Sequence, residues 1–218
     1  MERYVRQLQL GPMQNFVYLV GAAGAHEVAV VDPAWDVEAI LAAAAEDGKT
    51  ITAALLTHHH HDHVNGLQPL LERTGGVRAY AQRAEIAFSP VLQRFGRDLT
   101  PVDPGERIDV GPMRVTCVHT PGHTPGSQCF HFDDALVSGD TVFIGGCGRC
   151  DLAGGDPEQM FDSLHRVLGS LPGETTLFPG HDYADRPTST LADERARNPY
   201  FVRGDLESFV AYRMRPRT

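Results

Sequence analysis

The amino-acid sequence predicts an α+β fold in which two mixed sheets pack face to face with helices on the outside. Each half of the chain gives several strand-like segments and then one or two helical ones, and neither half shows the regular strand–helix alternation of a parallel α/β sheet. Hydrophobic residues make up 42% of the chain, which is enough for an ordinary buried core. A length of 218 residues suits one domain, which we expect to span residues 1–218.

In the first half, strands are expected where apolar residues alternate or cluster between turn residues. Helices are expected where good helix formers follow a capping residue, as after Asp36, and they end at Gly48 or are interrupted at Pro69 and Pro90. The expected strands are 5–10, 15–20, 27–31, 51–56 and 77–81, and the expected helices are 36–46, 64–73 and 82–97.

The second half repeats the strand pattern around the turns Gly111-Pro112 and Asp133-Asp134. A helix is expected after Asp156, since Pro157 suits a first helical position. The expected strands are 107–110, 113–118, 127–132, 135–140 and 175–178. Loops are expected at 99–105 and 145–155, a helix at 157–168, and helical sequence at the end of the chain.

The most informative stretch is 58–63, which reads His-His-His-His-Asp-His directly after the strand expected at 51–56. Imidazole and carboxylate groups are the ligands of Zn, Fe and Mn. A solvated polar loop is one alternative. An expression tag is another, but tags lie at termini and are not interrupted by Asp. The composition therefore favours a metal site.

Three later strand ends have the same character, with His123, Asp140 and His181 each preceded by Gly. Strand ends in a layered sheet meet at one edge, so ligands that are distant in sequence can converge there. Within 58–63, alternate side chains of an extended segment share a side, and a turn into a helix near Asp62 brings the next residues back to the cleft. This spacing gives one group of His58, His60 and His123, a second group of Asp62, His63 and His181, and Asp140 as a bridge.

Several other polar residues are less strongly indicated as metal ligands. Asp32 ends an apolar run, where it either starts a helix or supports the ligands from behind. His59 and His61 are expected to pack or to support ligands, and His165 to be exposed. The CxxC spacing of Cys147 and Cys150 is a weak indication of zinc or redox chemistry without a second pair.

The net charge and the hydropathy of the chain argue against two classes of binding partner, nucleic acids and membranes. A formal net charge of −9 argues against nucleic acid, which needs a basic face. No apolar run reaches the length of a membrane span, and the first residues lack the layout of a signal peptide. We therefore expect a cytoplasmic protein that binds a small molecule rather than a nucleic acid or a membrane. A homodimer is compatible with the sequence.

The ligand pattern resembles that of the metallo-β-lactamase superfamily. Residues 57–63 match its HxHxDH motif, and His123, Asp140 and His181 match its remaining ligand positions in order. The resemblance covers nearly the full chain and implies a four-layer αβ/βα sandwich with two divalent ions, Zn, Fe or Mn. It implies that His58, His60 and His123 bind the first ion, that Asp62, His63 and His181 bind the second, that Asp140 bridges them, and that Asp32 supports the ligands.

Two branches of the superfamily compete. The histidine run, the segment 15–20 and the segment 138–143 resemble glyoxalase II, which hydrolyses S-hydroxyacylglutathione thioesters. The segments 146–151, 179–183 and 189–199 resemble the persulfide dioxygenases, which oxidise glutathione persulfide with O₂. The second resemblance implies one Fe(II) held by His58, His123 and Asp140, the usual two-histidine, one-carboxylate set.

We expect a metal-dependent hydrolase of the glyoxalase II type, in which a metal-bound hydroxide attacks a thioester carbonyl. Asp62 is the expected catalytic residue, acting mainly as a ligand and orienting group. By analogy with both branches, Arg149 and Tyr183 would contact a thiol-derived substrate, or would only pack their loops. The alternatives are the Fe(II)-dependent persulfide dioxygenase and a metal-binding module without catalysis.

Overall fold

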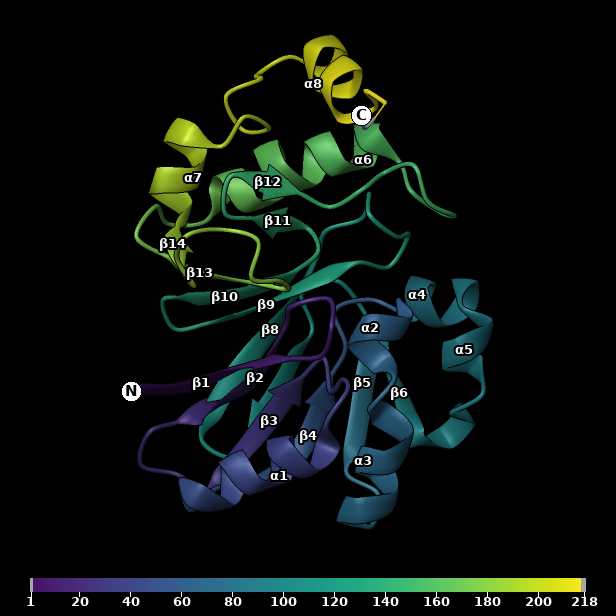
Figure 1. The fold of residues 1–218 in the computed structure, drawn as a ribbon, viewed down its shortest axis with the longest axis vertical. Helices are drawn as coiled ribbons and strands as arrows, with labels where there is room; N and C mark the ends of the chain where they lie inside the picture. The colour runs from purple at the N-terminus through teal and green to yellow at the C-terminus, as the bar shows by residue number, and fades with distance from the viewer. Residues whose placement is uncertain (1, 217–218) are drawn as a thin grey trace.

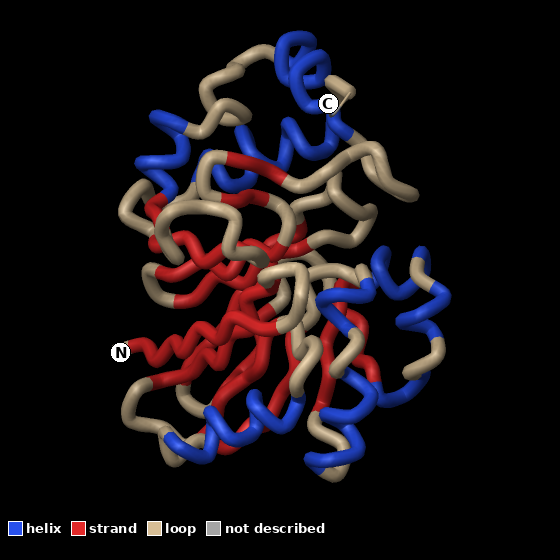
Figure 2. The backbone as a smooth tube through the Cα atoms, viewed as in Figure 1, coloured by secondary structure: helices blue, strands red, loops and turns tan. Residues whose placement is uncertain are grey.

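Two six-stranded sheets packed face to face form the centre of the computed structural model, which describes residues 2–216. Helices cover the outer face of each sheet, so the molecule has four layers (Figures 1 and 2). This arrangement is the αβ/βα sandwich expected from the sequence, and the prediction of the fold class is confirmed.

The first sheet has the strand order β1-β2-β3-β4-β5-β6. The first three strands are antiparallel, and β3 to β6 run parallel. Parallel neighbours need crossover connections, and short helices supply them. The strands are β1 (Arg3–Leu10), β2 (Asn15–Ala22), β3 (Glu27–Val31), β4 (Thr50–Leu55), β5 (Arg78–Gln82) and β6 (Leu99–Val102).

The second sheet has the order β14-β13-β10-β9-β8-β7, and β10 and β13 are its parallel pair. A two-stranded hairpin of β11 (Val142–Phe143) and β12 (Gly146–Cys147) lies beside it. The strands of the sheet are β7 (Arg107–Val110), β8 (Met113–His119), β9 (Gln128–Phe132), β10 (Ala135–Gly139), β13 (Thr176–Pro179) and β14 (Ser189–Thr190).

Helices begin at clear capping residues. The Asp36 carboxylate accepts the Ala39 N–H at 2.9 Å at the start of α1, and Asp156 accepts the Glu158 N–H at 2.9 Å at the start of α6. The helices are α1 (Val37–Glu46), α2 (His61–Val64), α3 (Leu67–Thr74), α4 (Arg83–Phe88), α5 (Pro90–Gln93), α6 (Pro157–Asp162), α7 (Leu191–Arg197) and α8 (Leu206–Arg213), with shorter turns η1 (Gly96–Asp98), η2 (Ser163–Val167) and η3 (Leu168–Ser170).

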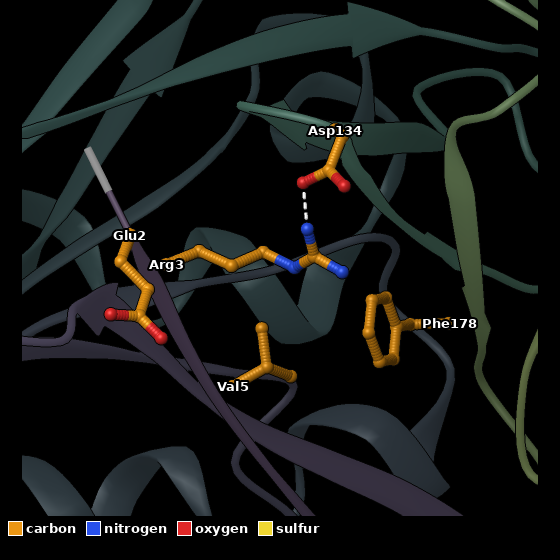
Figure 3. Close-up of a pocket in the computed structure, with 5 residues that line it drawn as sticks. All are labelled: Glu2, Arg3, Val5, Asp134 and Phe178. Carbon is orange, nitrogen blue, oxygen red and sulfur yellow. Dashed lines mark ion pairs between the residues drawn. The ribbon is translucent and has the colours of Figure 1, made fainter.

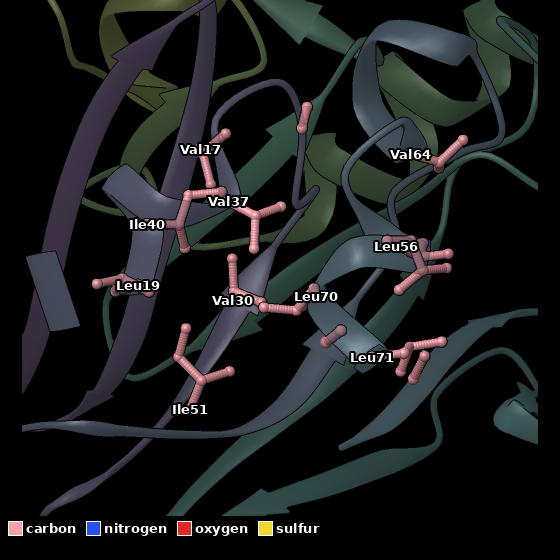
Figure 4. Packing of buried hydrophobic residues seen from close by; sticks show 14 of the residues in the cluster. Val17, Leu19, Val30, Val37, Ile40, Ile51, Leu56, Val64, Leu70 and Leu71 are labelled. Atoms are coloured by element: carbon pink, nitrogen blue, oxygen red, sulfur yellow. The ribbon is translucent and has the colours of Figure 1, made fainter. Parts of the chain in front are cut away.

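The alternation of side chains along β2 shows how the layers hold together. Val17 and Leu19 pack against α1 and α3 on the outer face (Figure 4), whereas Phe16 and Tyr18 face the second sheet. Successive strand residues point to opposite faces, and here both faces are buried. A third cluster lies between the second sheet and the helices α6 and α8, and includes Leu136, Leu177, Met160, Leu164 and Phe209.

Several expected elements were wrong in detail. Residues 99–102 form β6 rather than a loop, because Leu99 and Val102 are buried and pair with β5. The helix expected at 64–73 is two helices, α2 and α3, and the helix expected at 157–168 continues beyond Asp162 as the π-turn η2. His165 is half-buried rather than exposed, and its ring packs against that of Phe161 with centroids 4.3 Å apart.

The first strand is tied to the second sheet by Arg3, which forms an ion pair with Asp134 (Figure 3). Arg3 also donates to Thr176 Oγ1 at 3.3 Å. A hollow of about 470 Å³ opens between Arg3, Val5 and Phe178. None of the predicted ligands lines this hollow, so it is separate from the candidate site. Between residues 2 and 216, no helix has the length and apolar character that crossing a membrane requires.

Candidate metal centre

All the predicted ligands meet at one edge of the sandwich, where strands of both sheets end. His58 and His60 follow β4, Asp140 follows β10, and His181 follows β13. A cavity of about 380 Å³ opens there, with His58 and His63 buried beneath it. Its lining consists of Met13, His60, His61, Asp62, His123, Asp140, Phe143, Cys147, Arg149, Leu152, His181 and Tyr183.

The first group contains His58, His60 and His123, whose ligand atoms all lie within 4.8 Å of one another. His123 Nε2 is 2.9 Å from His60 Nδ1, and His58 Nε2 is buried without a hydrogen-bond partner among the described residues. Ligand atoms around a tetrahedral zinc, each roughly 2.0–2.1 Å from the ion, lie about 3.3 Å apart. The spacing and the unpartnered nitrogen therefore fit a divalent cation.

The second group contains Asp62, His63 and His181, and its ligand atoms also lie within 4.8 Å. The Nε2 atoms of the two histidines are 3.2 Å apart, and each lies 3.5 Å from Asp62 Oδ2. His63 is in the α2 turn that follows the extended run, as the spacing predicts. Two imidazole nitrogens and one carboxylate form a second donor set that suits a divalent cation.

Asp140 lies between the two groups. Its Oδ1 is 3.3 Å from His63 Nε2 and 3.4 Å from His181 Nε2, and its Oδ2 is 3.6 Å from His123 Nε2. The two glycines beside it are required by space: a Cβ on Gly139 would collide with Thr57, and a Cβ on Gly180 with the Asp140 carboxylate. The Asp140 carboxylate thus faces both groups, with Oδ1 toward the second group and Oδ2 toward the first.

Electrostatics of the buried ligands agree with cation binding. Burial and neighbouring histidines lower the pKa of His60 to about 4 and hold the pKa of His58 well below its usual value, so both are neutral donors at pH 7. Burial alone would lower the pKa of His63, but Asp140 and Asp32 raise it well above its usual value. Cation binding at the second group would therefore compete with protonation of His63.

In two of the candidate ligands, His123 and His181, the ring nitrogen that faces away from the cavity is Nδ1, and it bonds to a backbone carbonyl oxygen. This bond fixes the tautomer of each ring. His123 Nδ1 donates to the Arg149 carbonyl at 2.7 Å, and His181 Nδ1 donates to the Met13 carbonyl at 2.9 Å. Oriented in this way, the Nε2 atoms of His123 and His181 keep their lone pairs directed toward the cavity.

Asp32 orients one histidine of each group. Its Oδ2 accepts from His63 Nδ1 at 2.9 Å and from the Thr57 hydroxyl at 2.6 Å, and that hydroxyl lies 3.0 Å from His58 Nδ1. Because the hydroxyl donates to Asp32, it accepts from His58. Asp32 has a positive φ of 50°, which aspartate tolerates, and it does not start α1, which Asp36 caps.

The distances also allow a triplet of Asp32, His58 and His63. The oxygens of Asp32 are already engaged by the Thr57 N–H at 2.7 Å, by the Thr57 hydroxyl and by His63 Nδ1. These contacts place Asp32 behind His63 and Thr57, and its support of the ligands, the second of the two roles that the sequence left open, stays a prediction.

Sequence reasoning missed two supporting residues. Asn15 Nδ2 donates to Asp62 Oδ2 at 2.9 Å, and Asn15 Oδ1 accepts from Trp35 Nε1 at 2.8 Å. Glu85, which is 1% exposed, accepts from the backbone N–H of His59 at 2.8 Å and from the Gly126 N–H at 2.7 Å. It joins the histidine run to the loop that carries His123. Glu85 belongs to no motif, and Asn15 only opens the segment 15–20 that resembles glyoxalase II, so the folded structure is needed to identify both contacts.

Arg149 and Tyr183, the predicted substrate contacts, both line the cavity. The Arg149 guanidinium binds the Asp151 carboxylate through two contacts of 2.9 Å, and the Tyr183 ring stacks on His181 with centroids 4.6 Å apart. Cys147 lines the cavity as well, and both it and Cys150 are buried thiols that form no disulfide.

The fold and the geometry of the two ligand groups are consistent with a site for two metal ions. A model of the metallo-beta-lactamase superfamily matches residues 10–181, and the chain belongs to this superfamily. The resemblance predicted from the histidine run is therefore confirmed, and hydrolase is the class of enzyme that the relatives support.

Individual relatives cover most of the chain. It is 34% identical to the probable polyketide biosynthesis zinc-dependent hydrolase PksB of Bacillus subtilis, over 92% of this chain and 88% of that protein. It is 40% identical to the hydroxyacylglutathione hydrolase of Rhodospirillum rubrum, over 82% of this chain but only 66% of that protein. The crystal structure of ETHE1 from Myxococcus xanthus superposes with a TM-score of 0.87 at 30% identity, covering 98% of this chain and 92% of that one.

The support that Asp32 gives to both groups leads to a first prediction. Asp32→Asn should weaken divalent-metal affinity roughly 10- to 100-fold, because it weakens the orientation of His63 and of His58 through Thr57. Chelator competition measures the affinity. Asp36→Asn, which alters only the cap of α1, is the matched control. Equal affinity for the Asp32 variant and the wild type would show that Asp32 does not orient the ligands.

Glu85 gives a prediction about pH. Burial raises its pKa, but His59 and Thr124 outweigh burial and hold the pKa below its usual value. A carboxylate whose pKa is lower in the folded state stabilises the fold above its unfolded pKa and loses this effect as pH falls. Glu85→Gln should therefore lower the free energy of unfolding by roughly 1–3 kcal/mol at pH 7.

Urea denaturation at pH 7 and at about pH 4 checks this expectation, since the deficit of the variant should shrink at the lower pH. Glu207→Gln, on an exposed position of α8, provides the control and should differ little from wild type. A deficit that is the same at both pH values would contradict the charge-based account of Glu85.

Proposed function

We propose that this protein is a metal-dependent thioester hydrolase of the glyoxalase II type, acting on a small thiol-derived substrate. The single observation that carries the proposal is Asp140, whose two oxygens face two complete ligand groups. In this proposal His58, His60 and His123 hold one divalent ion, Asp62, His63 and His181 hold another, and Asp140 contacts both. The 40% identity to a hydroxyacylglutathione hydrolase supports the choice of reaction.

Divalent ions bound there would lower the pKa of a water molecule and polarise the substrate carbonyl. The chain itself supplies orientation. Asn15 holds one oxygen of Asp62, so that this carboxylate serves as ligand and orienting group, the catalytic role expected from the sequence. A leaving thiolate is the conjugate base of a group with a pKa of about 8.5, so the reaction needs no strong general acid.

The cavity wall supports a substrate with both polar and apolar parts. Arg149 and Tyr183 line it together with Phe143, Leu152 and Met13. We assign Arg149 and Tyr183 to substrate contact because both line the cavity, and Tyr183 is 56% exposed with its ring stacked on His181.

A persulfide dioxygenase with one Fe(II) is the second candidate. Cys147 and Arg149, in the segment that resembles that branch, line the cavity. The likeness to ETHE1 over 98% of this chain favours the same candidate. Against it stands the second group, which is as complete as the first although one iron would need only His58, His123 and Asp140. A metal-binding module without catalysis would not need a cavity that opens onto the ligands.

His181 separates the two activities, because it belongs only to the second group. His181→Ala should reduce thioester hydrolysis roughly 100-fold or more if the hydrolase proposal holds, whereas a one-iron dioxygenase should keep its oxygen consumption. Asp140→Ala should remove bound metal and activity together. The measurements are hydrolysis of an S-hydroxyacylglutathione and O₂ uptake with glutathione persulfide.

His26→Ala is the matched control, since the His26 side chain is exposed and its ring bonds to the Gly48 carbonyl at 2.9 Å, away from the metal cavity. Wild-type protein that consumes O₂ with persulfide but leaves thioesters intact would refute the hydrolase proposal. Full hydrolysis by the Asp140→Ala variant would do so as well.

A further inference from the structure

A second cavity of about 290 Å³ adjoins the metal cavity. Its lining residues come from α2, α3, α5 and the segments that adjoin them. Figure 1 shows these three helices at the right of the view. His61 lines both cavities, so the two cavities are neighbours on either side of this side chain. We name it the α2–α5 groove; its lining is His61, Val64, Asn65, Gln68, Val91, Arg94 and Phe95.

Part of the groove is apolar. Val64 is buried, whereas Val91 is 44% exposed and Phe95 is only partly covered by the core. Exposed valine and phenylalanine side chains gain free energy when an apolar ligand covers them. The groove therefore suits a ligand with a branched or bulky apolar part.

Two amide side chains add a donor and an acceptor. Asn65 Oδ1 accepts the Trp35 N–H at 2.6 Å, which leaves Asn65 Nδ2 without a partner among the described residues. Gln68 Nε2 donates to Glu72 Oε1 at 2.7 Å, and no described residue contacts Gln68 Oε1. A free N–H donor and a free oxygen acceptor complement the carbonyl and the N–H of a ligand amide.

Arg94 supplies a positive charge to the groove. Within residues 2–216 its guanidinium forms no ion pair, in contrast to Arg73 and Arg83, which bind Glu38 and Asp103 at 2.9 Å and 2.8 Å. No carboxylate lines the groove. In a chain with a net charge of −9, an unpaired arginine in a groove favours an anionic ligand group.

We propose that the α2–α5 groove binds the phosphopantetheine arm of a thioester substrate. This proposal rests on the proposed hydrolase function. This arm carries amides near its sulfur, then a dimethyl-substituted carbon, and a phosphate beside that carbon. Asn65 and Gln68 meet the amides, Val91 and Phe95 cover the dimethyl group, and Arg94 binds the phosphate. The acyl part then faces Phe143, Leu152 and Tyr183 in the metal cavity.

Glutathione fits the groove less well, although it also contains amides. It carries two carboxylates and an ammonium group, whereas the lining offers one arginine and no carboxylate. The exposed Val91 side chain and the partly exposed Phe95 side chain would face charged or polar groups of the tripeptide. The chemistry of the lining therefore separates the two thiol carriers that a thioester hydrolase could use.

Kinetics with matched thioesters test the proposal. The substrates are the acetyl thioesters of 4′-phosphopantetheine, of pantetheine without phosphate, and of glutathione. The wild type should show a KM for the phosphorylated arm roughly five- to tenfold lower than for the unphosphorylated one, as expected for a charge-assisted contact at a partly exposed site. Arg94→Gln should abolish this preference.

Arg97→Gln is the matched control, because Arg97 is exposed three residues further along and does not line the groove. It should keep the phosphate preference. Val91→Asp should raise the KM for both pantetheine thioesters while leaving the KM for acetylglutathione little changed. A phosphate preference that survives Arg94→Gln, or a lower KM for the glutathione thioester in the wild type, would overturn the proposal.

Binding of the arm without its sulfur atom separates this proposal from the hydrolase proposal. Calorimetric titration with desulfo-4′-phosphopantetheine should show binding to the wild type and to Arg97→Gln, and weaker binding to Arg94→Gln. If no thioester is hydrolysed but this binding pattern is found, the hydrolase activity fails and the groove assignment stands. Absence of binding to the wild type overturns the groove assignment, whatever the activity.

Discussion

The buried carboxylate of Asp140 is the contact on which the site depends. It is placed among imidazole nitrogens that lie close together, such as the Nε2 atoms of His63 and His181 at 3.2 Å. Burying several such groups is costly unless each finds a partner of opposite charge or a hydrogen bond. Cations at the two groups supply that partner, which is why the site is consistent with a dinuclear metalloprotein.

The fold meets this requirement by ending strands of both sheets at one edge and then fixing each ligand from behind. Asp32 reaches His63 directly and His58 through Thr57, while backbone carbonyls hold His123 and His181. Glu85 holds the histidine run against the loop of His123. The ligands are thereby oriented by hydrogen bonds that do not involve a metal, so the architecture is preorganised for binding.

The sequence predicted how the candidate ligands are grouped, because their placement follows local rules. Alternation in an extended run placed His58 and His60 on one side, and the turn at α2 returned Asp62 and His63 to the cleft, as the structure confirms. Asn15 and Glu85 could not be found in this way, since their partners lie 47 and 26 residues away. The β6 strand was missed for the same reason, because burial against β5, rather than local composition, makes residues 99–102 a strand.

Function within the superfamily depends on whether the second group binds a cation as the first does. Two ions suit the hydrolase, and one iron suits the dioxygenase, although the same residues serve both. Elemental analysis of the purified wild-type protein, after equilibration with excess divalent metal and removal of unbound ions, tests this most directly. The structure leads us to expect two metal ions per chain. A stable content of one iron per chain would contradict the account.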